Sequence, residues 1–174
     1  MALRTHGIER VPGREPWYYE MRALGFNYRI TDIQCAMGIV QMKKLPGFLQ
    51  KRRPIVKIYK RTLQNLPFVT VPTEAQGCRY AWHLFVLRID FKKLGKTRVQ
   101  LFQELRRQAI GLQVHYIPIY KQPYYRKNVP KNSTFPESEA YYRQCVSLPL
   151  FPRMTKKDVG RVVQAVQSFV LSRR

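Results

Sequence analysis

The sequence is poor in acidic residues: its 174 positions include 10 Asp and Glu against 32 Lys and Arg, which gives a formal net charge of +22. Histidine is also scarce, and His6, His83 and His115 lie far apart in the sequence. This composition argues against a metal enzyme and against a carboxylate pair for glycoside hydrolysis. The motifs GxxxxGK[ST], GxGxxG and GxSxG are absent as well, so no self-contained active site is evident.

Cysteine and long apolar runs are lacking too. Cys35, Cys78 and Cys145 are odd in number and widely spaced, which argues against a disulfide framework and against a CxxC zinc site. No run approaches the roughly 18 apolar residues of a membrane span, and the first residues do not form the charged-then-apolar pattern of a signal peptide. We therefore expect a cytoplasmic protein that does not cross a membrane.

The positive charge has two interpretations. Apolar residues make up 45% of the chain, enough for the core of one domain or of part of a larger one. The Lys and Arg clusters are spread along the whole sequence, which is typical of a solvated surface, whereas nucleic-acid sites concentrate basic and aromatic side chains. We do not expect specific nucleic-acid binding, but a basic, non-enzymatic protein that binds nucleic acid or anionic surfaces remains the alternative function.

The first part of the chain predicts an irregular segment followed by helices. Residues 1–30 contain Pro and Gly breakers and are expected to lack regular structure. Thr31 and Gln34 have the spacing of a capping box, which predicts the start of a helix. Pro46 is expected to end this helix and to open a second one that is kinked at Pro54.

After residue 67 the pattern predicts alternating strands and helices. Runs of aromatic and β-branched residues predict three strands, and residues at helical spacing predict three helices. The expected strands cover residues 68–71, 80–89 and 112–117. The expected helices cover 97–110, which Thr97 caps, 137–145 and a final segment capped by Thr155. The predicted fold class is α+β, with helices packed on a small, mainly antiparallel sheet.

Two of the histidines leave alternatives open. His115 lies within the expected strand 112–117, where the period of two places it on the same side as Gln113 and Ile117. It is either a packed, hydrogen-bonded residue at the sheet surface or a residue that binds a ligand. His83 has the same two interpretations.

Several stretches, in this order, resemble one protein family. They are Leu3–Ile8, Leu24–Gly38, Gln41–Leu45, Trp82–Val86, Val114–Tyr120, Gln122–Tyr125 and Leu148–Pro152. Together they resemble the C-terminal part of the DegT/DnrJ/EryC1/StrS family of pyridoxal-phosphate (PLP)-dependent nucleotide-sugar aminotransferases. The resemblance implies the C-terminal small domain of the aspartate-aminotransferase (type I PLP) fold. It divides the chain into a lead-in after the large domain (1–30), interdomain and dimer helices (31–66) and a small α+β domain (67–174).

The resemblance also implies an activity, amination of a 4-keto nucleotide sugar for polysaccharide or glycan synthesis. The stretch Val114–Tyr120 is most similar to transaminases that act on a UDP-linked 4-keto-6-deoxy-N-acetyl sugar. In the family, the lysine that binds PLP covalently lies in the large domain, and no lysine here stands in a comparable motif. We therefore expect a fragment that is inactive alone. It would be a truncated product, one half of a split enzyme or a product without function. Its expected partner is either a separate large-domain chain or a second copy of itself in a homodimer.

The resemblance implies binding residues but no catalytic residue and no metal ligand. Asn27 and Arg29 match positions that contact the cofactor phosphate and the substrate across the family's homodimer. His115, Tyr116 and Tyr120 match positions that line the sugar pocket, although many family members carry His where this chain has Tyr120. Without the resemblance, Asn27 would only stabilise the turn before the helix and Arg29 would be one more surface cation.

Overall fold

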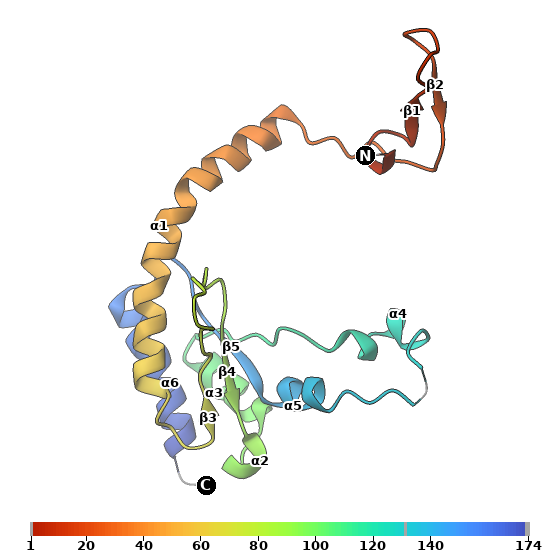
Figure 1. Ribbon diagram of the computed structural model, residues 1–174. Helices are drawn as coiled ribbons and strands as arrows, with labels where there is room; N and C mark the ends of the chain where they lie inside the picture. Colours follow the sequence, from red (N-terminus) through yellow and green to blue (C-terminus); the bar gives the residue numbers. More distant parts are fainter. Residues whose placement is uncertain (1, 131, 173–174) are drawn as a thin grey trace. The chain divides into compact units, whose positions relative to one another are not determined.

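The computed structural model describes residues 2–130 and 132–172. The chain divides into two compact units, Met1–Pro46 and Gly47–Arg174, each of which is described by itself. Figure 1 shows the order of the helices and strands along the chain.

The first unit contains a hairpin where the sequence predicted irregular structure. After the 3-10 helix η1 (Ala2–Arg4), strand β1 (Ile8–Arg10) pairs antiparallel with β2 (Tyr19–Met21). The Pro12-Gly13 breaker lies in the connection between them, where Gly13 has a φ of +80°. Such residues exclude a helix but suit a turn between paired strands, so the expectation of an irregular lead-in was wrong for this part of residues 1–30.

A second pairing in this unit brings the chain on either side of the hairpin together. Thr5 forms an isolated antiparallel bridge with Asn27, and the backbone N–H of His6 donates to the carbonyl of Phe26 over 3.0 Å. At Gly7 a Cβ would lie 1.7 Å from the Ala23 carbonyl oxygen. Glycine is therefore required at this crossing, which places His6 beside the residues that follow Gly25.

Helix α1 runs without interruption from Asp32 to Leu63. The capping box is confirmed: the Thr31 N–H donates to Gln34 Oε1 over 2.9 Å, and the Gln34 N–H donates to Thr31 Oγ1 over 3.3 Å. The prediction that Pro46 ends the helix was wrong, and Pro54 lies inside it as well. Proline has a helical φ and removes one backbone hydrogen bond; its cost is local, and the helix continues because its second half packs against the core.

The second unit is built on a three-stranded antiparallel sheet. Its strands β3 (Val69–Thr70), β4 (Phe85–Ile89) and β5 (Cys145–Leu148) are ordered β3-β4-β5. The expected strand 112–117 is not a strand, since only an isolated bridge joins Gln113 to Ser147. The sequence missed β5, whose four residues are all buried and so show no alternation of apolar and polar side chains.

The second unit contains several further helices. They are α2 (Phe91–Leu94), α3 (Arg98–Arg107), the 3-10 helix η2 (Ile119–Lys121), α4 (Pro123–Arg126), α5 (Pro136–Gln144) and α6 (Lys156–Leu171). Thr97 and Thr155 both form capping boxes. Helix α3 ends before the expected residue 110, because Ala109 has a positive φ of 56° that is incompatible with a right-handed helix.

The core of the second unit lies between its sheet and helices α1, α3 and α6. The fully buried apolar side chains include Tyr59, Leu63, Phe85, Leu87, Ile89, Leu101, Leu105, Val146, Val159 and Val166. The only polar residue that is buried in the described part of the chain is Ser147, with 4% of its surface exposed. Helices on a small antiparallel sheet confirm the predicted α+β class.

Candidate functional site

Asn27 and Arg29 lie together in the first unit, as two neighbours of His6. The Arg29 Nε donates to Asn27 Oδ1 over 2.9 Å, and Arg29 Nη2 lies 3.5 Å from His6 Nε2. The Thr5–Asn27 bridge holds the two segments in register. Because arginine can only donate, the Asn27 atom that faces it is the amide oxygen, and the Asn27 NH₂ group is left to donate elsewhere.

The donor set of this cluster fits a phosphate. All three side chains are exposed, and a guanidinium and an amide are the donors that bind such anions. The expected cofactor also needs an amine that can attach it covalently. Every lysine that the structure describes is exposed or half-buried, so these residues fit the phosphate contact but do not supply an enclosed lysine.

The half-buried lysines are also held by hydrogen bonds of their own. Lys60 Nζ donates to Glu74 over 2.9 Å, and Lys121 Nζ donates to Glu139 over 2.7 Å. Lys96 Nζ donates to the carbonyl of Phe169 and to Ser172 at the end of α6. An ammonium held in this way is occupied by its acceptors and is not free to act as a nucleophilic amine.

His115 is half-buried and contacts strand β5. Its Nδ1 lies 2.8 Å from the hydroxyl of Ser147, while the backbones of Gln113 and Ser147 exchange two hydrogen bonds of 3.3 and 2.8 Å. The ring stands edge-on to that of Tyr116, with 4.6 Å between the centroids. His115 Nε2 has no hydrogen-bonding partner among the described residues, so the ring is anchored at one nitrogen only.

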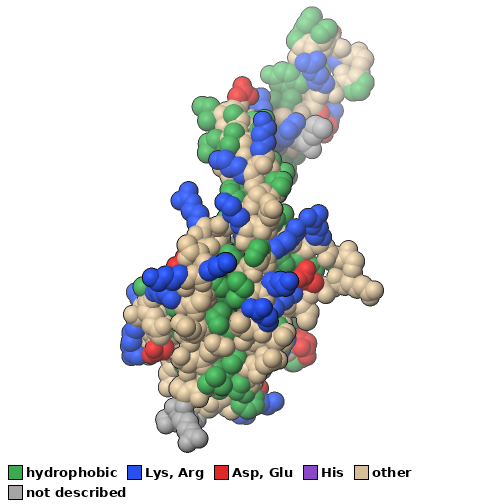
Figure 2. All heavy atoms as spheres, turned by 90° about the vertical axis from the view of Figure 1, so that its left-hand side faces the viewer, with side chains coloured by type: hydrophobic (Ala, Val, Ile, Leu, Met, Phe, Trp, Pro, Cys, Tyr) green, Lys and Arg blue, Asp and Glu red, His purple; other side chains and the backbone are tan. Residues whose placement is uncertain are grey.

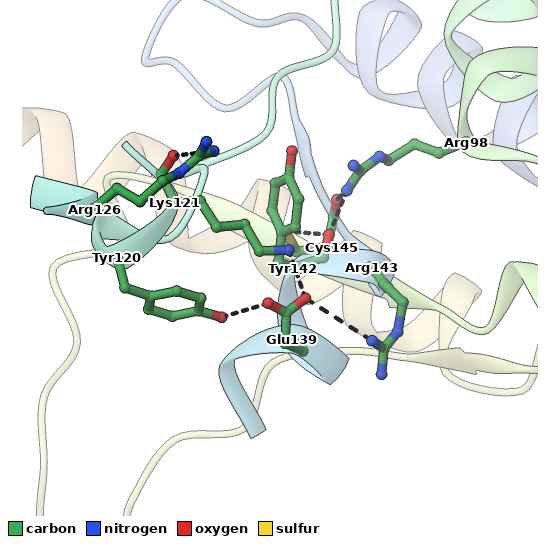
Figure 3. A network of polar contacts seen from close by, with 8 residues as sticks. All are labelled: Arg98, Tyr120, Lys121, Arg126, Glu139, Tyr142, Arg143 and Cys145. Carbon is green, nitrogen blue, oxygen red and sulfur yellow. Dashed lines mark hydrogen bonds and ion pairs between the residues drawn. The ribbon is translucent and has the colours of Figure 1, made fainter. Parts of the chain in front are cut away.

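Tyr120 belongs to a different polar network, which Figure 3 shows from close by. Its hydroxyl donates to Glu139 Oε1 over 2.9 Å, and the other carboxylate oxygen binds Lys121 at 2.7 Å and Arg143 at 3.9 Å. Hydrogen bonds from Lys121 and then from Tyr120 lower the pKa of Glu139. Burial and the hydrogen bond to Glu139 raise the pKa of Tyr120.

The aromatic ring of Tyr142 links this network to helix α3. The Lys121 ammonium lies 5.4 Å from the ring centroid and the Arg98 guanidinium lies 4.9 Å from it. Arg98 also donates to the carbonyls of Tyr142 and Cys145 (Figure 3). The segment that carries Tyr120 is therefore tied to α5 and, through α5, to α3.

The predicted sugar-binding residues do not line one cavity. Tyr120 and its stacking partner Phe135, with centroids 4.3 Å apart, line an open groove of about 500 Å³ together with Glu139 and Arg143. His115 is anchored instead on β5, and Tyr116 is 73% exposed. Sequence reasoning missed Glu139 and Ser147; the scarcity of acidic residues could have singled out Glu139, whereas Ser147 has no sequence signal.

Other kinds of site find no support in the described residues. Within residues 2–130 and 132–172, no three His, Cys, Asp or Glu side chains lie close enough to bind a metal ion. Over the same residues, no helix combines the length and apolar character that a membrane crossing needs. Figure 2 shows Lys and Arg side chains scattered over the viewed face among apolar and neutral groups, without a single basic patch.

Two curated relatives match nearly the whole chain. An uncharacterised protein from Methanocaldococcus jannaschii is 39% identical over 178 residues, which cover 99% of this chain and 46% of the relative. The spore coat polysaccharide biosynthesis protein SpsC from Bacillus subtilis is 36% identical over 176 residues, which cover 97% of this chain and 45% of SpsC. The chain thus spans a little under half the length of these relatives.

Solved structures have the same fold as this chain, and the chain again covers less than half of each of them. The chain is 25% identical to DesV from S. venezuelae, with a TM-score of 0.82 over 99% of this chain and 43% of DesV. It is 25% identical to PseC from Helicobacter pylori, an aminotransferase involved in pseudoaminic acid biosynthesis, with a TM-score of 0.80 over 95% of this chain and 43% of PseC. Spr1654 from Streptococcus pneumoniae, solved in its PLP form, matches with a TM-score of 0.80 at 22% identity, over 98% of this chain and 43% of Spr1654.

The family assignment follows from the extent of these matches. The model of one family, described as the DegT/DnrJ/EryC1/StrS aminotransferase family, matches residues 1–167. These residues include the cluster around Arg29, the His115–Ser147 contact and the network around Glu139. The chain belongs to the DegT/DnrJ/EryC1/StrS aminotransferase family.

Proposed function

We propose that this chain forms the C-terminal part of a PLP-dependent aminotransferase that transfers an amino group to a 4-keto nucleotide sugar. The family match over residues 1–167 and the similarity to SpsC and PseC support a role in polysaccharide or glycan sugar synthesis. The observation that carries the proposal is the exposed Arg29–Asn27 pair, because it presents phosphate donors in a stretch through which the chain resembles the family.

The family resemblance gives each predicted residue a task, and its chemistry is compatible with that task. Arg29 and Asn27 would bind the phosphate of PLP, the first through its charge and the second through its free NH₂ group. PLP, when bound, supplies the electron-withdrawing ring that allows an amino group to be exchanged between two substrates. His115 and Tyr116, which lie in the second unit, would contact a bound sugar nucleotide. The hydrogen bond to Glu139 would keep the hydroxyl of Tyr120 neutral and oriented.

We further propose that activity requires a lysine-bearing large domain. None of the described lysines is both enclosed and unpaired, and the chain covers less than half of its relatives. The large domain would belong to the same polypeptide or to a separate chain, and the resemblance implies a homodimer in which Arg29 reaches the partner's cofactor. The division into residues 1–30, 31–66 and 67–174 and a cytoplasmic location remain predictions.

Reconstitution tests this function. The chain is purified alone, and the part of SpsC that precedes the matched region is produced separately. We expect the chain alone to give no borohydride-stable PLP adduct, and the mixture to gain visible cofactor absorbance and to carry the adduct on the large domain. A stable adduct on one lysine of the isolated chain would overturn the need for a large domain. An absence of cofactor absorbance at high concentrations of both parts would overturn the proposed activity.

A further inference from the structure

Ser147 is an unusual residue in this core. It is the only buried polar residue in the described part of the chain, with 4% of its surface exposed. Strand β4 pairs with it through Val86 on one side, and Gln113 pairs with it on the other. A polar side chain in such a position costs stability unless it is hydrogen-bonded.

The hydroxyl of Ser147 has one partner. Its Oγ lies 2.8 Å from Nδ1 of His115, and no second hydrogen-bonding group for it exists among the described residues. The backbone hydrogen bonds between Ser147 and Gln113 place His115, two residues further along, beside the same hydroxyl. Ser147 therefore holds the His115 segment through its backbone and the His115 ring through its side chain.

The direction of this hydrogen bond follows from the number of available partners. If His115 Nδ1–H donated to Oγ, the hydroxyl proton of Ser147 would be left in the core without an acceptor, which is the costly case for a buried donor. If the hydroxyl donates to Nδ1, both groups are satisfied and the ring proton resides on Nε2.

We propose that Ser147 is a positioning residue that selects the Nε2–H tautomer of His115 and aims this N–H away from β5 as a donor. The ligand it suits is an oxygen acceptor, which in the proposed function is a carbonyl, hydroxyl or phosphate oxygen of the sugar nucleotide. The role toward the sugar nucleotide rests on the proposed function, whereas the selection of the tautomer does not.

The tautomer is measured directly on the full chain. Long-range ¹H–¹⁵N spectra of ¹⁵N-labelled protein at mildly alkaline pH distinguish the two ring nitrogens of each histidine. His83 is exposed and serves as the internal reference for an unconstrained ring. We expect His115 to favour the Nε2–H form about fivefold more than His83, which is the effect of one net hydrogen bond. An equal ratio in both, or an excess of the Nδ1–H form at His115, would overturn the proposal.

Variants separate the hydroxyl from general packing. Ser147→Ala is expected to bring the His115 ratio to that of His83, and Ser147→Thr to restore the wild-type ratio. Val146→Ala, at a neighbouring fully buried position, is the matched control that destabilises β5 and leaves the ratio unchanged. If Ser147→Ala does not fold, the comparison of the tautomer ratios of His115 and His83 in the wild-type chain still tests whether the tautomer of His115 is selected. If the tautomer ratio of His115 in a folded Ser147→Ala variant equals the wild-type ratio, the proposal is contradicted.

A second measurement addresses the substrate. In the reconstituted enzyme, Ser147→Ala is expected to raise the KM for a UDP-linked 4-keto sugar about tenfold, with unchanged cofactor absorbance. An unchanged KM and kcat would overturn the role toward the substrate. Failure of the wild-type parts to gain cofactor absorbance would instead overturn the proposed function, while the spectra still decide whether Ser147 sets the tautomer.

Discussion

At the scale of single residues, the site is a set of side chains oriented by their neighbours. Asn27 receives a hydrogen bond from Arg29, His115 binds Ser147, and Tyr120 donates to Glu139. In each case the partner occupies one polar atom and thereby decides which other atom remains for a ligand.

Replacing Arg29 tests the phosphate contact. In the reconstituted enzyme, Arg29→Gln is expected to weaken PLP binding at least about tenfold, because it removes a charge-assisted hydrogen bond to the phosphate. The affinity is measured by titration of the cofactor absorbance. Arg10→Gln, at another exposed arginine of the same unit, should leave it unchanged. The loss should disappear with pyridoxal, which lacks the phosphate; an equal loss with both compounds would argue against this contact.

Glu139 makes stability dependent on pH. Its pKa is lowered in the folded chain by hydrogen bonds from Lys121 and Tyr120, so the ionised carboxylate stabilises the fold above its unfolded pKa. This contribution is lost as the pH falls through the lowered, folded pKa. Glu139→Gln should therefore lower the urea midpoint at neutral pH, and the difference from wild type should vanish in acid.

The control for this prediction is on the same helix. Glu137 lies in the first turn of α5 and makes none of the contacts of Glu139, so Glu137→Gln should change the urea midpoint much less at neutral pH. If the two variants lose the same stability, or if the effect of Glu139→Gln persists in acid, the network is not what stabilises this segment.

At the scale of helices and strands, the sequence predicted where several helices begin but not where they end. The predicted capping box at Thr31 and the predicted caps at Thr97 and Thr155 are confirmed, because a cap depends on a side chain and a backbone group only three residues apart. Helix α1 passes through Pro46, where the sequence predicted an end. Whether a helix survives a proline depends on packing of the rest of the helix, which short-range patterns do not contain.

Replacing the N-cap residue of α6 tests how much a helix cap contributes to stability. Thr155→Ala removes the hydroxyl that accepts from the Asp158 N–H over 3.2 Å, and it should lower the free energy of unfolding by about 1 kcal/mol. Denaturant unfolding measures the change. Ser168→Ala, on the exposed side of the same helix, should change the stability by less than about 0.5 kcal/mol. A similar loss in both variants would mean that the cap is not decisive.

At the scale of the whole molecule, the first unit exposes apolar side chains. Ile33 and Met37 on α1 are 76% and 63% exposed, and Leu24 is 74% exposed. Apolar surface of this kind mediates contacts with other proteins or causes aggregation. In the proposed enzyme, this surface would face the large domain or a second copy of the chain.

The isolated chain should accordingly self-associate. We expect static light scattering to give a mass above that of the monomer, rising with concentration, and Met37→Lys to reduce it by adding charge to the exposed face. Val99→Lys, at an apolar position of α3 that is 64% exposed, is the matched control and should have little effect. A monomer at all concentrations would contradict the expected role of this surface.

The sequence by itself determined the α+β class, the capped starts at Thr31, Thr97 and Thr155, and the family resemblance, now confirmed. These features depend on residue types and on spacings of a few residues. Only the tertiary structure decided that β5 is a strand, that Ser147 meets His115 and that Glu139 binds Tyr120. Such contacts join residues 19 and 32 positions apart, and their existence depends on packing of the whole unit, which no local pattern encodes.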